Sequence, residues 1–190
     1  MRRRSFIRAA ASIVPATSLC DLFSGEARAQ APRSTRARVL HVVGDGQDRD
    51  GDAHVLAFGS LLFKVLTRET SGGLFVVEHP HMRAGSGPPL HLHLSQEEWF
   101  YVMEGEVAFQ VGDQRVQLHA GESVLAPRRV PHTFSSVAAT PSRMLIAFSP
   151  AGKMEQFFLD VENPKAPVGK AEFWRRYEME LIGPSPFRKS

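Results

Sequence analysis

From residue 61 onward, short runs of apolar residues alternate with turn-forming residues at regular spacing. Pairs such as Glu104-Gly105 and Gly112-Asp113 separate the runs, and the second pair is typical of a tight hairpin. Many short apolar runs at this spacing indicate an antiparallel sandwich or small barrel. We therefore predict an all-β domain with strands at Leu61–Thr67, Gly73–His79, Pro89–His93, Glu98–Met103, Glu106–Val111, Gln114–His119, Ser123–Ala126, His132–Val137 and Met144–Phe148.

Further elements are predicted on both sides of this region. Arg38–Val43 is apolar enough for a short first strand. Apolar residues recur at positions i, i+3, i+4 and i+7 within Gly152–Val161, which predicts an amphipathic helix. A second stripe within Lys170–Ile182 predicts another, with Phe173, Trp174, Tyr177 and Leu181 on one side. We expect both helices to pack against the barrel.

Residues 1–29 have the pattern of an export signal. A basic start is followed by a short, weakly apolar stretch and by Ala27-Arg28-Ala29, which fits a small-x-small cleavage site. The stretch is too short for a bilayer core, which needs about 20 apolar residues, so we expect no stable membrane anchor. Arg3-Arg4-Ser5-Phe6-Ile7 resembles the twin-arginine motif of bacterial export. This resemblance implies the twin-arginine export machinery as a partner and a periplasmic or secreted location.

Cleavage after Ala29 would change the charge and the cysteine content of the chain. The whole sequence has 23 Lys and Arg against 20 Asp and Glu, but the signal holds five of the basic residues and two of the acidic ones. The mature chain would therefore carry 18 of each, which gives no reason to expect nucleic acid as a partner. The only cysteine, Cys20, would also be lost, so neither a disulfide nor a thiol nucleophile is expected.

The residues with the clearest chemistry lie in two neighbouring parts of the strand region. His91 and His93 are one residue apart in a strand, so their side chains share a face. A neighbouring strand can bring Glu98 to the same point, and His132 follows a later turn. Three imidazoles and one carboxylate suit a divalent transition metal such as Fe, Mn, Ni, Co, Cu or Zn. Four inward polar groups would be costly to bury without such an ion.

The other histidines and Glu97 are not expected to bind the metal. His79 and His81 repeat the i, i+2 spacing, and we expect them at a strand end near the mouth of the pocket. Alternation places Glu97 on the face opposite Glu98, so we expect it to point outward. No role is assigned to the other histidines of the mature chain, which are His41, His54 and His119.

This arrangement resembles the two sequence motifs of the cupin superfamily. The first motif is Gly85, five residues, His91, one residue, His93, four residues, Glu98, six residues and Gly105. The second is Gly121, five residues, Pro127, one residue, Arg129, two residues, His132, three residues and Ser136. Arg129 and Ser136 replace the usual Gly and Asn, but neither is a ligand position. The chain also resembles single-domain bacterial cupins of the quercetin 2,3-dioxygenase-like group.

The resemblance implies an antiparallel jelly-roll barrel with two short C-terminal helices. On this reading residues 1–29 are the signal, 30–56 a tether and first strand, 57–150 the barrel, and 151–190 the helices. His91, His93, Glu98 and His132 would bind the metal. Alternation predicts an apolar, aromatic pocket around it, formed by Phe100, Val102, Phe109 and Phe134.

Three hypotheses about function follow. The first is a metal-dependent dioxygenase that acts on a small aromatic, flavonol-like or enediol substrate, with Glu98 taking a proton from the substrate. The second is a periplasmic cupin that binds a small molecule without converting it. The third is a metal-dependent isomerase or decarboxylase. The sequence does not choose among them, and it leaves a homodimer open.

Overall fold

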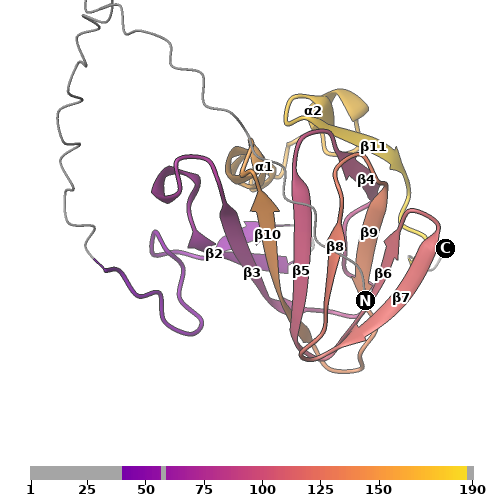
Figure 1. The fold of residues 1–190 in the computed structure, drawn as a ribbon, viewed down its shortest axis with the longest axis horizontal. Coiled ribbons are helices and arrows are strands. Elements are labelled where there is room, and N and C mark those ends of the chain that lie inside the picture. Colours follow the sequence, from indigo (N-terminus) through magenta and orange to yellow (C-terminus); the bar gives the residue numbers. More distant parts are fainter. Residues whose placement is uncertain (1–39, 57–58, 188–190) are drawn as a thin grey trace, which may run out of the picture. The chain divides into compact units, whose positions relative to one another are not determined.

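Eleven β-strands form two antiparallel sheets in this computed structural model, which describes residues 40–56 and 59–187. The strands lie within residues 41–190, which form one compact unit (Figure 1). Their bounds are β1 His54–Leu56, β2 Gly59–Val65, β3 Phe75–Met82, β4 Leu90–His93, β5 Glu97–Glu104, β6 Glu106–Val111, β7 Gln114–His119, β8 Ser123–Ala126, β9 His132–Ser136, β10 Ser142–Ser149 and β11 Met179–Gly183. A 3-10 turn, η1, spans Thr67–Glu69.

The two sheets face each other as a jelly-roll barrel. One sheet has the order β1-β2-β3-β10-β5-β8 and the other β11-β4-β9-β6-β7, so neighbouring strands are often far apart in sequence. Consecutive strands β5 and β6 lie in different sheets, and the chain crosses from one to the other at Gly105, whose φ is 76°. The predicted all-β jelly-roll is confirmed.

Alternation along β5 shows how the sequence separates inside from outside. Glu98, Phe100 and Val102 are buried, whereas the residues between them are exposed or half-buried. The buried aromatic rings pack together, with ring centroids 5.0 Å apart for Phe100 and Phe109 and 5.9 Å apart for Phe109 and Phe134. Period-2 alternation with one face in the core is the pattern expected for a half-buried strand.

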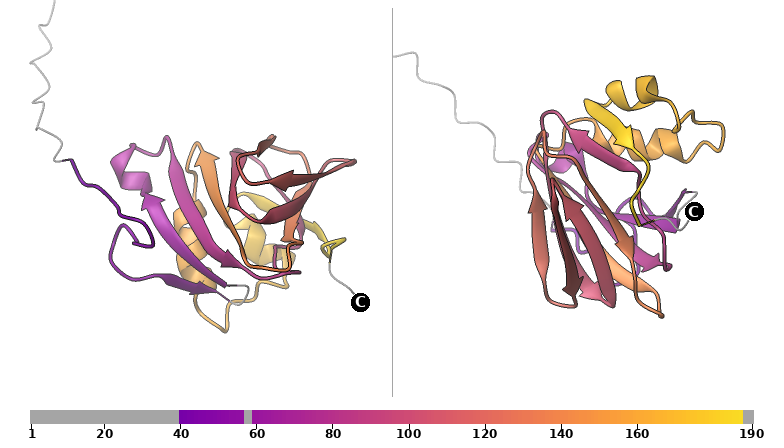
Figure 2. Two further views of the ribbon diagram at one scale, coloured as in Figure 1. Left: turned by 90° about the horizontal axis from the view of Figure 1, so that it is seen from below. Right: turned by 90° about the vertical axis from the view of Figure 1, so that its right-hand side faces the viewer.

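Two short helices follow the last barrel strand, as the sequence predicts. They are α1 Met154–Val161 and α2 Ala171–Arg175, and together with β11 they lie at one end of the barrel (Figures 1 and 2). The predicted extent of the second helix is wrong. Glu178 adopts a φ of 60°, which ends the helical path, and Met179–Gly183 then pairs with β4 as strand β11.

The first predicted strand also differs from the structure. Residues 38 and 39 of Arg38–Val43 lie outside the described residues, and residues 40–43 form no strand. Leu40 and Val42 are exposed, so no neighbouring strand covers them. The first strand is instead β1, which pairs with β2. The predicted signal at 1–29 and most of the tether lie outside the described residues.

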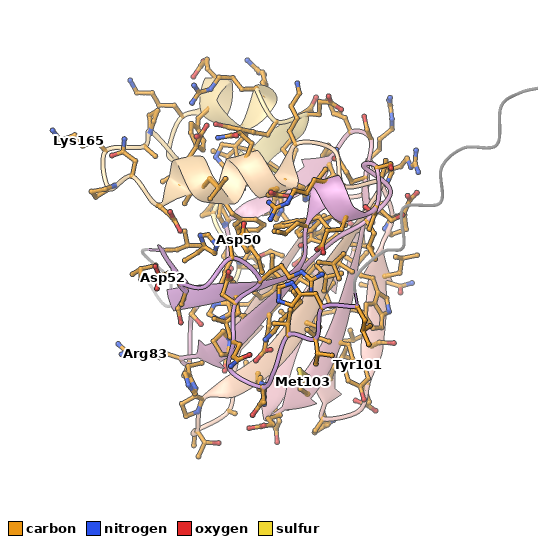
Figure 3. The ribbon with its side chains drawn as sticks, turned by 90° about the vertical axis from the view of Figure 1, so that its left-hand side faces the viewer. Asp50, Asp52, Arg83, Tyr101, Met103 and Lys165 are labelled. Atoms are coloured by element: carbon orange, nitrogen blue, oxygen red, sulfur yellow. The ribbon has the colours of Figure 1, made fainter. Side chains whose placement is uncertain are left out.

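No helix in the described part of the chain is both long and apolar enough to span a bilayer. Charged side chains such as Arg83 and Lys165 project away from the barrel (Figure 3).

Candidate metal centre

Three strands bring the candidate ligands together. His91 and His93 lie on β4 with their side chains on one face, as the i, i+2 spacing predicts. His132 begins β9 and lies directly opposite His91 in the pairing of the two strands. Glu98 comes from β5 in the other sheet. The four residues therefore meet between the two sheets.

The distances among the four side chains suit a single metal ion. One nitrogen or oxygen from each residue lies within 4.8 Å of the others, and all four residues are buried. Glu98 Oε2 lies 2.8 Å from His132 Nε2 and 3.0 Å from His93 Nε2. Two ligands with bonds of about 2.1 Å on adjacent corners of an octahedron are about 3.0 Å apart, which matches these spacings.

Backbone carbonyls fix the orientation of two imidazoles. His91 Nδ1 donates to Pro89 O and His132 Nδ1 donates to Val130 O, both at 2.9 Å. Nδ1 of each ring therefore carries a proton, and Nε2 is the nitrogen directed at the candidate site. Without a metal, the contact of His132 Nε2 with Glu98 requires a second proton on that ring, which metal binding would displace. His93 Nδ1 is buried and has no hydrogen-bond partner within the described residues.

Burial and mutual charge give these groups unusual acidities. Burial, with the nearby His132 and His93, lowers the pKa of His91 to about 3, so this imidazole is neutral and able to ligate. Burial opposes ionisation of Glu98, but hydrogen bonds from His132 and His93 outweigh it and hold the pKa of this carboxyl below its usual value. The set thus combines the neutral imidazole of His91 and the anionic carboxylate of Glu98 with the imidazoles of His93 and His132.

The donor set fits a divalent transition metal. The carboxylate and the three imidazoles are nearly excluded from water. Other interactions must replace their lost hydration, because an isolated buried charge costs several kcal/mol. The hydrogen bonds among the four provide part of it, and the orphaned Nδ1 of His93 shows that they do not satisfy every group. A bound cation would satisfy the carboxylate and the three Nε2 atoms together, and mixed N/O sets of this kind suit Fe, Mn, Co, Ni, Cu or Zn.

A cavity of about 620 Å³ opens beside the ligand group. Its volume lies in the range of about 300–1,000 Å³ that is typical of small-molecule sites. The wall is mainly apolar. Trp174 packs against His91 and Phe148 against His93 in tilted arrangements, at ring-centroid distances of 5.2 and 5.7 Å. The lining residues are Leu61, His79, Gly87, Pro88, Pro89, His91, His93, Glu98, Phe134, Ile146, Phe148, Met154, Phe157, Phe158, Val161, Val168, Gly169, Trp174, Met179, Leu181, Ile182, Gly183 and Pro184.

The predicted pocket residues divide into two groups. Phe134 lines this cavity, but Phe100, Val102 and Phe109 do not and lie instead in the hydrophobic core. All three point inward, as alternation predicts, and are almost fully buried. They occupy the part of the barrel that side chains fill, whereas the cavity extends from the ligands toward the C-terminal helices.

Residues 154–184 form a wall that the sequence did not predict. Met154, Phe157 and Trp174 were predicted only to pack against the barrel, yet they also line the cavity. The sequence feature that could have indicated this wall is the density of aromatic residues in the two apolar stripes. Glu97 points outward and forms an ion pair with Arg128, in agreement with its predicted orientation.

Fold and site together define a small β-barrel protein with a buried site that fits a metal ion. Comparisons with known proteins agree. The sequence profile of the Cupin domain family matches residues 79–148. A structure of an RmlC-like cupin from Shewanella frigidimarina superposes with a TM-score of 0.51 at 22% identity, over 61% of this chain and 96% of that one, which shows the fold alone.

Two curated relatives are similar in sequence. "Polyketide synthase CurC" from Streptomyces cyaneus is 31% identical over 68% of this chain and 80% of its own. "Oxidoreductase iacF" from Pestalotiopsis fici is 32% identical over 58% of this chain, and the match spans only 54% of the relative's own length. With the profile match and the fold, these similarities show that the chain belongs to the cupin superfamily.

Proposed function

We propose that this cupin is a metal-dependent dioxygenase that acts on a small aromatic compound, flavonol-like or enediol in type. The observation that carries the proposal is the contact between the ligand group and the apolar cavity: His91, His93 and Glu98 form part of the cavity wall. A substrate in the cavity would therefore lie against the metal. The name of the oxidoreductase relative supports a redox reaction.

The cavity wall favours an uncharged, planar substrate. Among the described residues that line it, only Glu98 is acidic and none is a lysine or arginine. A phosphorylated or strongly anionic substrate would find no countercharge there. Rings such as Phe148, Phe157 and Trp174 offer flat surfaces and exclude water from the reacting end.

In the proposed reaction the metal ion and the protein side chains have separate roles. A divalent ion held by His91, His93, Glu98 and His132 would supply a Lewis acid that lowers the pKa of a substrate hydroxyl. Glu98 would take the released proton on Oε1, because Oε2 contacts His93 and His132. Its lowered pKa keeps the carboxylate ionised before the transfer, although it also makes Glu98 a weak base. His91 and His132, fixed by backbone carbonyls, hold their lone pairs in place.

We also propose that the protein works after export through the twin-arginine pathway, in the periplasm or outside the cell. The support is the Arg3-Arg4 motif and the cleavage signal that ends at Ala29.

Oxygen uptake tests the proposed reaction. Metal-loaded protein is given flavonols, catechols and enediols in turn, with oxygen consumption and incorporation of labelled dioxygen measured together. A dioxygenase consumes one O₂ per substrate molecule and places both oxygen atoms in the product, so it needs no external reductant. His93→Ala serves as the metal-deficient control.

Two results would contradict the proposal. Tight binding of these compounds without turnover would instead indicate a binding protein. Conversion of the substrate without oxygen uptake would indicate an isomerase or decarboxylase on the same metal.

A further inference from the structure

The lining of the cavity reaches the protein surface at two short segments. Most of the lining residues are buried or half-buried, and those exposed to solvent are Val168, Gly169, Ile182 and Pro184. Exposed apolar residues are common singly, but exposed apolar residues that also line a cavity mark a ligand-binding groove. His79, which the sequence predicts near the mouth of the pocket, is only 1% exposed and so is not part of this opening.

Strand pairing places the second exposed segment beside the strand that carries two of the candidate ligands. Strand β11 pairs with β4, so that Leu181 lies opposite His91 and Gly183 lies opposite Leu90. The register of the two strands shifts between these pairs, at Ile182. Ile182 is 48% exposed although it lines the cavity. This side of the opening is therefore built on β4.

Trp174 attaches the first exposed segment to the same strand. Its indole N–H donates to Val168 O at 2.7 Å, and its ring lies 5.2 Å from the ring of His91. In the described part of the chain, the other hydrogen bonds of residues 164–169 join near neighbours, such as Val168 N to Ala166 O. The indole N–H therefore holds this loop, and with it Val168, beside β4.

The first segment also leaves free space at the opening. A Cβ atom added to Gly169 would meet nothing within 4 Å. The φ of Gly169 is not positive, so a larger residue at this position causes no backbone strain. The width of the opening can therefore be changed at Gly169 without disturbing the packed barrel.

We propose that small molecules enter the cavity between residues 168–169 and 182–184, and that Trp174 is a positioning residue that holds the first side of this entrance. The inference concerns access to the cavity, and it requires neither a particular substrate nor turnover. The apolar side chains of Val168 and Ile182 favour the passage of uncharged, apolar compounds. Loss of the indole N–H would release the loop and widen the entrance.

The binding kinetics of a neutral probe test the entrance. The dye N-phenyl-1-naphthylamine, which fluoresces in apolar surroundings, is mixed with Zn²⁺-loaded protein in a stopped-flow instrument. Gly169→Trp and Ile182→Trp should each slow association and dissociation by about 10-fold, which corresponds to about 1.4 kcal/mol in the barrier. The Kd should stay nearly constant, because bulk at an entrance raises the barrier equally in both directions.

Trp174→Phe tests the positioning role. Phenylalanine keeps a ring beside His91 but has no N–H for Val168 O. Both rates should rise by about 5-fold, because one hydrogen bond has a net value of about 1 kcal/mol. Metal content should stay at the unmodified level. A merely structural role in the cavity wall would change the Kd without a parallel change in the two rates, and unchanged rates would likewise overturn the positioning role.

Lys165→Trp is the matched control for added bulk. Lys165 belongs to the same loop, but it projects from the protein and does not line the cavity (Figure 3). Its substitution should leave both rates unchanged. Rates in Gly169→Trp and Ile182→Trp equal to those in Lys165→Trp would overturn the entrance. Absence of dye binding by the unmodified protein would also overturn it, whereas the proposed reaction is judged separately by oxygen uptake.

Discussion

His132 Nε2 lies 2.8 Å from Glu98 Oε2, although the two residues are 34 positions apart and belong to different sheets. This contact joins β9 to β5 through the interior of the barrel. The candidate metal site is therefore also a link between the two sheets, and a change at one of these two residues is expected to affect the other.

Removal of a single imidazole ligand is expected to abolish most metal binding. His91→Ala, His93→Ala and His132→Ala each remove one nitrogen from a group whose four ligand atoms lie within 4.8 Å. Elemental analysis of the purified variants measures the loss. His119→Ala is the matched control, because His119 is exposed and its ring contacts Glu122 on the surface. Full metal occupancy in His93→Ala would refute the site.

Glu98→Gln is expected to reduce turnover far more than metal content. The amide keeps the shape of the side chain and one acceptor oxygen but loses the charge and the basicity. If Glu98 is the proton acceptor, the rate should fall by about 10²–10⁴-fold. Turnover and metal content are measured on the same preparations.

Glu97→Gln provides the comparison for that experiment. Glu97 points outward and pairs with Arg128, so both quantities should remain near the unmodified level. Equal turnover in Glu98→Gln and Glu97→Gln would exclude Glu98 from the mechanism.

Gly87→Ala is expected to destabilise the fold beside the cavity. A Cβ atom at position 87 would lie 1.9 Å from the carbonyl oxygen of Phe134, a backbone atom that cannot move without its strand. Overpacking of this kind costs about 1–3 kcal/mol. Urea unfolding measures the change. Gly169→Ala should be nearly neutral, since nothing lies within 4 Å of its added Cβ, and equal effects of the two would contradict the packing argument.

Acid is expected to destabilise the protein partly through His79. Its pKa is about 4 in the folded state, against an ordinary value of 6.5, so the unfolded chain binds the extra proton first as the pH falls. The stability associated with the neutral ring is complete above pH 6.5 and is lost toward pH 4. Between pH 7 and 4.5 this loss is about 2.5 kcal/mol.

The measurement compares urea unfolding of the metal-free protein with that of metal-free His79→Leu at both pH values. The variant should lose about 2.5 kcal/mol less stability, because it lacks the titrating ring. Parallel losses in the two proteins would show that His79 does not titrate on unfolding.

Changing Arg3 and Arg4 to Lys is expected to stop export. The twin-arginine pathway requires the arginine pair, so full-length, metal-loaded protein should accumulate in the cytoplasm. Fractionation of cells followed by immunoblotting detects this. Normal export of the Lys pair would show that another pathway recognises the signal.

The sequence predicts those parts of this molecule that depend on local pattern. Strand alternation places Glu98 inside and Glu97 outside, and the i, i+2 spacing places His91 and His93 on one face. Strand β11 escaped prediction because Tyr177 and Leu181 continue the helical spacing of α2. The break occurs at Glu178, a residue type that rarely adopts a positive φ.

The cavity was harder to predict than the ligands. Phe100 and Phe134 share the same inward pattern, but only Phe134 lines the cavity. The fold of residues 154–184 over the barrel decides which inward residues border the cavity. No local sequence pattern encodes how far this segment lies from the barrel strands. The role of Trp174 beside His91 follows only from this tertiary arrangement.

The metal ligands and much of the cavity wall come from separate segments of the chain. The ligands lie between His91 and His132 in the barrel, whereas residues 154–184 supply the helices and β11 that close the cavity. Substitutions in the later segment can therefore reshape the space offered to a substrate while the ligands stay in place. In evolutionary terms, this separation would let one inherited ligand group serve different small molecules through changes in the C-terminal cover alone, and a protein engineer would have the same route.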